Sequence, residues 1–176
     1  EALRENIEII AITDHLEYQQ KKQDIPNPDL NRSYIIAKGS VSEKDLIVLR
    51  GSEITRDMPP GHFNAIFIKD ANKLLNLNDS IAGIIEANKQ GAFVFWNHPN
   101  WTSKNAGRID GIARLDPLHK ELISKNLIHG LEVANEDTFS EEAIEIAIEN
   151  NLTILGTSDI HGLVDWDFDI PNGGHR

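Results

Sequence analysis

Short apolar runs alternate with amphipathic segments along most of the chain. The apolar runs are rich in β-branched and aromatic residues, which predicts buried strands. We place these strands at 7–13, 46–49, 63–68, 92–96, 130–134 and 153–156. Apolar residues at helical spacing predict the intervening helices. We place these helices within 31–44, over 80–90, over 116–126, and from Ser140 onward.

Local signals support several of these boundaries. Asp116 can cap the third helix, and Pro117 follows in the first turn, where proline is tolerated. Gly91 is placed to close the second helix. The polar stretches at 16–30 and 100–114 predict loops. Residues 1–6 lack a start signal and are typical of the end of a helix, so we expect further sequence upstream of Glu1.

Alternating strands and helices predict an α/β fold with a parallel sheet. A doubly wound sheet and a barrel both fit the alternation. Polar candidates stand at many separate strand ends, and such ends converge only if they form a ring, which favours a barrel. We therefore expect one domain over 1–176, a distorted seven-stranded (β/α)7 TIM-like barrel that lacks its first strand in this sequence.

Composition narrows the function classes. The chain of 176 residues has a net charge of −11, which argues against non-specific nucleic-acid binding and against docking on an anionic membrane. It has no cysteine, so any metal must be held by histidine and carboxylate. No apolar run approaches the length of about 20 residues that spans a bilayer. We expect a cytoplasmic protein, with secretion left open because a leader can precede Glu1.

Histidines and acids recur at the edges of the predicted strands. These candidate metal ligands are His15, Glu53, His62, His98, Asp159 and His161. Any one of them can equally be an ordinary solvated or packed side chain. Their shared position at strand edges indicates a metal site more strongly than any single residue does. Pro99 predicts an extended backbone at His98. Asp159 and His161 lie two apart after a strand, so in extended geometry both face the same way.

Other polar residues are weaker candidates. Loop cations and a histidine near the end of the chain are candidates for holding a phosphate. They are Arg56, Lys104, Arg108, His175 and Arg176. Glu132 and Asn135 stand at the tip of the fifth predicted strand and face either the ligands or the substrate. His119 lies within a helix and His129 precedes a strand, so we interpret both as structural.

The sequence contains no phosphate-binding Walker loop, no Gly-x-Ser-x-Gly nucleophile motif and no dinucleotide fingerprint. Without cysteine or a nucleophile motif, covalent catalysis is unattractive. A water activated by metal ions is then the simplest nucleophile.

Over nearly its whole length the chain resembles the polymerase and histidinol phosphatase (PHP) family. The motifs that carry the resemblance, in the family's order, are Ile10-Ala11-Ile12-Thr13-Asp14-His15, Gly51-Ser52-Glu53, His62-Phe63-Asn64, Asn97-His98-Pro99 and Ser158-Asp159-Ile160-His161. The resemblance implies a distorted seven-stranded barrel with up to three divalent metal ions, zinc, manganese or iron. It also implies hydrolysis of a phosphoester of a small metabolite or nucleotide.

The same resemblance implies roles for individual residues. Glu53 would bridge two metals and Asp159 would bind the first of them. His62 and His98 would hold the second metal, and His15 and His161 the third. The family's opening His-x-His motif is absent, which leaves the first and third metals short of ligands in this sequence.

The proton donor to the leaving group is open between Asp14, Asp159 and a histidine. With Glu53 as the metal-bridging residue, the predicted catalytic residues are Glu53, Asp159 and Asp14.

Two alternatives stay open at this stage. A metal-dependent amidohydrolase shares the barrel and the histidine and acid ligands, and metal content separates the two, since three ions favour the phosphoesterase. A non-catalytic metal-binding module is the other alternative, supported by the absent first motif. The sequence leaves the substrate, the metals and the oligomeric state undetermined.

Overall fold

The computed structural model describes residues 2–19, 28–136, 138–162, 165 and 172. The strands, in chain order, are β1 (Ile9–Ile12), β2 (Ile47–Ile54), β3 (Phe63–Ile66), β4 (Phe93–Trp96), β5 (Gly130–Asn135), β6 (Thr138–Phe139) and β7 (Thr153–Thr157). The helices are α1 (Arg32–Gly39), the short 3₁₀ helix η1 (Ala71–Lys73), α2 (Ala82–Lys89), α3 (Pro117–Ser124) and α4 (Glu141–Glu149).

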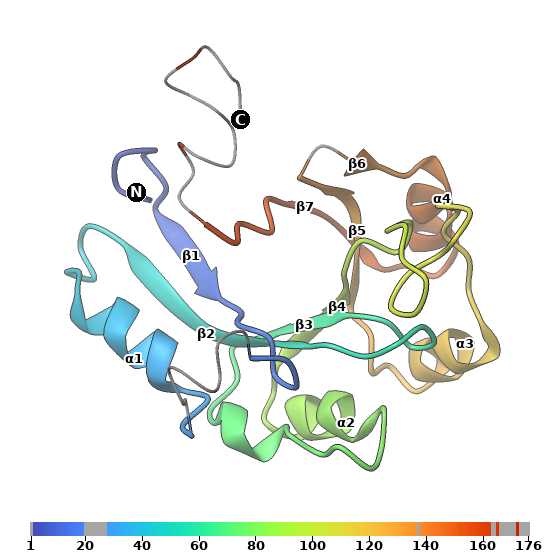
Figure 1. Ribbon diagram of the computed structural model, residues 1–176, viewed down its shortest axis with the longest axis horizontal. Helices are drawn as coiled ribbons and strands as arrows, with labels where there is room; N and C mark the ends of the chain where they lie inside the picture. The colour runs from blue at the N-terminus through green and yellow to red at the C-terminus, as the bar shows by residue number, and fades with distance from the viewer. Residues whose placement is uncertain (1, 20–27, 137, 163–164, 166–171, 173–176) are drawn as a thin grey trace.

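The strands form one mixed sheet in the order β1-β2-β3-β4-β5-β6, with β7 paired to β5. The pairs β1–β2, β4–β5 and β5–β7 are parallel, whereas β2–β3, β3–β4 and β5–β6 are antiparallel. The sheet curves into a half-barrel with the helices on its outer side, and β1 and β7 lie at its two ends (Figure 1).

The expected (β/α)7 TIM-like barrel is therefore wrong. In a parallel sheet, successive strands are joined by a crossover connection of about a dozen residues or more, which usually contains a helix. Only residues 55–62 join β2 to β3, and they contain no helix, so the chain turns back and the two strands pair antiparallel. The short β6, which pairs with the end of β5, was also not predicted.

The predicted helices and longer strands are present, with shifted ends. Ser140 caps α4 as expected, because its Oγ accepts a hydrogen bond of 3.1 Å from the backbone N–H of Ala143. Gly91 ends α2 with φ +84°, a conformation that favours glycine. Residues 2–6 form turns and not the end of a helix.

Side chains that alternate along the central strands divide the sheet into an apolar face and a polar face. Phe63 of β3 pairs with Trp96 of β4 in the sheet register, and both are buried in the hydrophobic core. Trp96 stacks on His119 of α3 with ring centroids 4.0 Å apart, which joins the helix to the sheet. Glu53 of β2 pairs with Asn64 of β3, so acids and amides alternate with the apolar residues. The polar face is where the candidate ligands meet.

No described helix has the length and apolar character needed to cross a membrane.

Candidate metal centre

Glu53 lies at the centre of the cluster. Its side chain is 4% exposed, and Oε1 lies 3.1 Å from Nδ1 of His15 and 3.0 Å from Nδ1 of His62. Thr55 Oγ1 donates a further hydrogen bond of 3.0 Å to the same oxygen. The Glu53 backbone accepts from Leu16 N–H at 2.7 Å, which fixes the His15 segment beside β2. The pairing of β1 with β2 thus continues to the ligands themselves.

The remaining predicted ligands extend this cluster in both directions. The ring centroids of His62 and His98 are 5.1 Å apart, and those of His15 and His161 are 5.5 Å apart. Asp159 lies with His161, because their potential ligand atoms are within 4.8 Å of one another, and His161 is the neighbour of His15. Residues from β2, from the β3 and β4 ends and from the segments after β1 and β7 therefore meet at one place.

Two local expectations about these residues are wrong. His98 is not extended: its φ is +26°, in the left-handed region, despite the proline that follows. Asp159 is not extended either, with φ +46°. Its carboxylate and the His161 imidazole nevertheless lie together, with potential ligand atoms within 4.8 Å of one another.

Glu136 joins Asp159 and His161. Their potential ligand atoms all lie within 4.8 Å of one another. Glu136 was not among the predicted ligands, although it is the next residue after the β5 tip and fits the same pattern of acids at strand ends. The backbone N–H of Glu136 donates to the Thr157 carbonyl at 3.3 Å, which holds the ends of β5 and β7 together.

The electrostatics of the cluster favour charged Glu53 and neutral His98. Burial by itself would raise the pKa of Glu53, but hydrogen bonds from His15 and His62 hold it well below its ordinary value. The hydrogen bond to Glu53 raises the pKa of His15 against the opposing effect of burial. Burial, with the nearby charge of His62, lowers the pKa of His98. An ionised carboxylate and a neutral imidazole are the forms that bind metals.

The donor set fits a divalent cation. Nε2 of His62 is buried and has no hydrogen-bond partner among the residues that the structure describes. A buried polar atom without a partner is costly, and coordination would satisfy it. Imidazole nitrogens and carboxylate oxygens suit zinc, manganese and iron. The residues present therefore fit the metal site that the sequence predicts.

Glu132 of β5 is a buried residue that supports the cluster through hydrogen bonds. Its side chain is 1% exposed, and Oε2 accepts hydrogen bonds from the backbone N–H of His98 at 2.6 Å and from Nδ2 of Asn135 at 2.8 Å. Thr157 Oγ1 is hydrogen-bonded to Oε1. Burial, opposed by these hydrogen bonds, raises the pKa of Glu132 to about 7. One carboxyl group thus ties together the ends of β4, β5 and β7.

A structured loop places Trp101 beside the histidines. Its indole ring centroid lies 5.3 Å from that of His62 and 5.2 Å from that of His98. The backbone N–H of Trp101 donates to the His98 carbonyl at 2.8 Å, and the Trp101 carbonyl accepts from the backbone N–H of Arg108 at 2.7 Å. A Cβ on Gly107 would lie 2.1 Å from the same carbonyl, so only glycine permits this close approach.

We accordingly expect Gly107→Ala to lower the free energy of unfolding by about 1–3 kcal/mol, because the loop must move to admit the methyl group. Gly39→Ala is the matched control. A Cβ there meets no atom within 4 Å and Gly39 ends α1, so we expect no loss of stability. Urea unfolding monitored by circular dichroism measures both. Equal stabilities for the two variants would contradict the packing described at Gly107.

The residues predicted to hold a phosphate are dispersed. Arg56 forms an ion pair with Glu17 at 2.8 Å, and buried Arg108 forms one with Asp116 at 2.6 Å. These partners occupy both guanidinium groups within the protein. Lys104 is exposed in the Trp101 loop.

His175 and Arg176 lie outside the described residues. Asp14 is exposed, and its backbone carbonyl accepts from Glu53 N–H at 3.0 Å, which places it next to the cluster.

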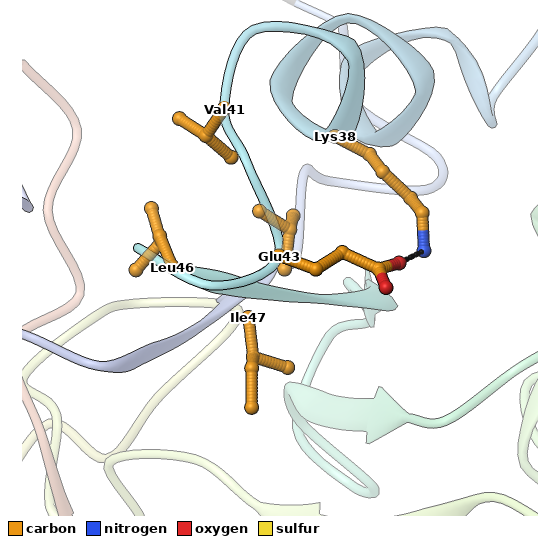
Figure 2. A pocket seen from close by; sticks show the side chains of 6 residues that line it. Lys38, Val41, Glu43, Leu46 and Ile47 are labelled. Carbon is orange, nitrogen blue, oxygen red and sulfur yellow. Dashed lines mark ion pairs between the residues drawn. The ribbon is translucent and has the colours of Figure 1, made fainter.

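A cavity of about 270 Å³ lies away from this cluster, at the connection from α1 to β2. Figure 2 shows its lining, in which Lys38 Nζ forms an ion pair of 2.7 Å with Glu43 beside Val41, Leu46 and Ile47. Both charged groups are occupied by each other, and none of the candidate ligands contributes to it.

The comparisons with known proteins agree with the cluster. A solved structure of a two-domain protein from Bacteroides vulgatus, described as containing a predicted PHP-like metal-dependent phosphoesterase, is 42% identical in sequence to this chain, with a TM-score of 0.90. The match covers 99% of this chain and 49% of that one. The chain thus resembles this PHP-like protein in structure as well as in sequence.

The chain spans about half the length of that two-domain protein. No protein-family model matches the chain, and no curated protein matches it. The similarity to a metal-dependent phosphoesterase agrees with the divalent metal use that the histidine and acid cluster indicates.

Proposed function

We propose that the chain hydrolyses a phosphoester of a small metabolite or nucleotide with the aid of divalent metal ions held by the described cluster. The observation that carries the proposal is the convergence of His15, Glu53, His62, His98 and His161 in one row of contacts, with Asp159 beside His161. The similarity to a predicted phosphoesterase favours a phosphoester over an amide as the bond that is cleaved.

The positions of these residues indicate a separate role for each in metal binding. Glu53 is buried between two imidazoles and contacts both halves of the cluster, so we assign it the bridging role. His62 and His98 would hold one cation. His15 and His161 would hold another, with Asp159 next to His161. When bound, such cations lower the pKa of a water molecule and neutralise phosphoryl charge.

The reaction adds a water oxygen to phosphorus and breaks the phosphorus–oxygen ester bond. The departing alkoxide needs a proton, and the chain offers carboxyl groups near the cluster for that purpose. Asp14 is exposed next to His15, and Asp159 lies with His161 at the same end of the cluster. We propose these two as the candidates for the proton donor.

Hydrolysis of a generic phosphate ester by the protein loaded with manganese or zinc tests the proposed function. We expect turnover that is lost on chelation and restored by the added cation. Metal content, measured by mass spectrometry on the loaded protein, distinguishes three ions from the one or two expected of an amidohydrolase. Absence of turnover with every divalent metal, while an amide substrate is cleaved, would refute the phosphoesterase assignment.

A further inference from the structure

The indole of Trp101 is an exposed apolar ring at the edge of the candidate metal centre. It is 42% exposed, although its ring lies against both His62 and His98. An exposed aromatic side chain is ordinary by itself. Here it stands beside the polar cluster at which the proposed substrate phosphate would bind, so its free surface faces whatever carries that phosphate.

The loop that presents this ring is not loosely arranged. The backbone of Trp101 is held on both sides, by His98 and by Arg108. Arg108 is itself buried, and its guanidinium donates to Asp116 at 2.6 Å and to the Arg114 carbonyl at 2.7 Å. Gly107 permits the tight backbone contact. The fold thus holds the backbone that carries the indole at a fixed place, which favours a preorganised binding surface.

A second aromatic ring stands at the other end of the cluster. Tyr18 meets His15 edge to face, with ring centroids 5.9 Å apart, and is 57% exposed. The two rings border a row of groups suited to cations and phosphate. The expected ligand therefore combines an anionic end with a planar, apolar end.

We propose that Trp101 is a stacking platform for a planar ring carried by the leaving group of the substrate, as in a nucleoside monophosphate. This inference rests on the proposed phosphoesterase function for the position of the phosphate. The indole face attracts any aromatic base, because every base has a π-face and stacking needs no matched hydrogen bonds. The platform therefore selects substrates with a ring over those without one and discriminates weakly among bases.

The test compares AMP with ribose 5-phosphate. Both release a primary alcohol from phosphate, so the chemical step is matched and only the base differs. We expect kcat/KM to be about ten- to a hundredfold higher for AMP, from the strength of base stacking on aromatic side chains. In Trp101→Leu this ratio falls toward equality, and in Trp101→Phe much of it is retained. Ile109→Ala, a change at a highly exposed residue of the same loop, is the control that keeps the ratio.

A second substrate pair separates stacking from general apolar contact. Benzyl phosphate and cyclohexylmethyl phosphate have leaving groups of similar size and reactivity, and only the first is aromatic. A preference for the benzyl ester that depends on Trp101 supports the platform. Equal kcat/KM values within both pairs, or a ratio unchanged in Trp101→Leu, would overturn it and leave the phosphoesterase function standing.

If the protein turns over none of these esters, equilibrium titration of the metal-loaded protein carries the test. AMP binding at least tenfold tighter than ribose 5-phosphate, with the difference removed in Trp101→Leu, supports the platform even though the phosphoesterase function has failed. Equal affinities overturn the platform as well.

Discussion

Glu53→Gln is expected to reduce kcat/KM for phosphate ester hydrolysis by at least about a hundredfold. Mutation of a residue that only hydrogen-bonds to a metal ligand already lowers metal affinity or activity by about 10–100-fold, and Glu53 is itself a proposed ligand. The change keeps the size of the side chain but removes the negative charge that faces His15 and His62. It also replaces one oxygen by an amide group that cannot coordinate a cation. Titration calorimetry with manganese or zinc should show the matching loss of metal affinity.

Glu145→Gln is the control for this change. Glu145 is exposed on α4, away from the cluster, and the same loss of one negative charge there should leave metal affinity and turnover unchanged. Full activity in Glu53→Gln would contradict the bridging role. A folded variant that binds metal normally would contradict it equally, whatever its activity.

Glu132→Gln should change how stability depends on pH in the metal-free protein. Burial raises the folded-state pKa of Glu132 to about 7 from its ordinary value of 4.5. Its protonated form is thus favoured by folding. The associated stability is fully present below about pH 4.5 and is lost as the pH rises to about 7, a loss of about 3 kcal/mol in the free energy of unfolding.

Glutamine resembles the protonated acid. Its oxygen can accept from His98 N–H and Asn135, and its amide group can donate to Thr157 Oγ1. The variant should therefore be more stable than the wild type at pH 8 and similar to it at pH 4.5, as measured by urea unfolding at a series of pH values. Comparing the two proteins cancels the titration of the histidines. Parallel stability profiles would show that Glu132 does not ionise within this range.

The sequence was sufficient to find the cluster because its signals are local. His15, Glu53, His62 and the residues near 98 and 159–161 each stand at the edge of an apolar run, and the structure brings all of them together. Their roles as ligands stay a prediction. Backbone details were not accessible in this way. The left-handed conformation of His98 is accompanied by a hydrogen bond to Glu132, a residue 34 positions away, which no local pattern reveals.

The error in the fold has an equally physical origin. Alternation of strands and helices predicts a parallel sheet only where a helix separates each pair of strands. No helix separates β2 from β3, and the strand run that began at Leu46 continued to Ile54, beyond the predicted end at 49. Glu53 therefore lies within a strand and not after one. The ligands converge through the curvature of a half-barrel, so convergence did not require the closed ring.

The proximity of His161 to His15 has a consequence for folding. One follows β7 and the other follows β1, the two ends of the curved sheet, with no backbone pairing between those strands among the described residues. A cation bound by both histidines would link the two ends of the sheet. Each tenfold rise in its free concentration above Kd would then add about 1.4 kcal/mol to the stability of the folded form. Amide exchange in the terminal strands should slow on metal loading, while the middle of the sheet is already protected.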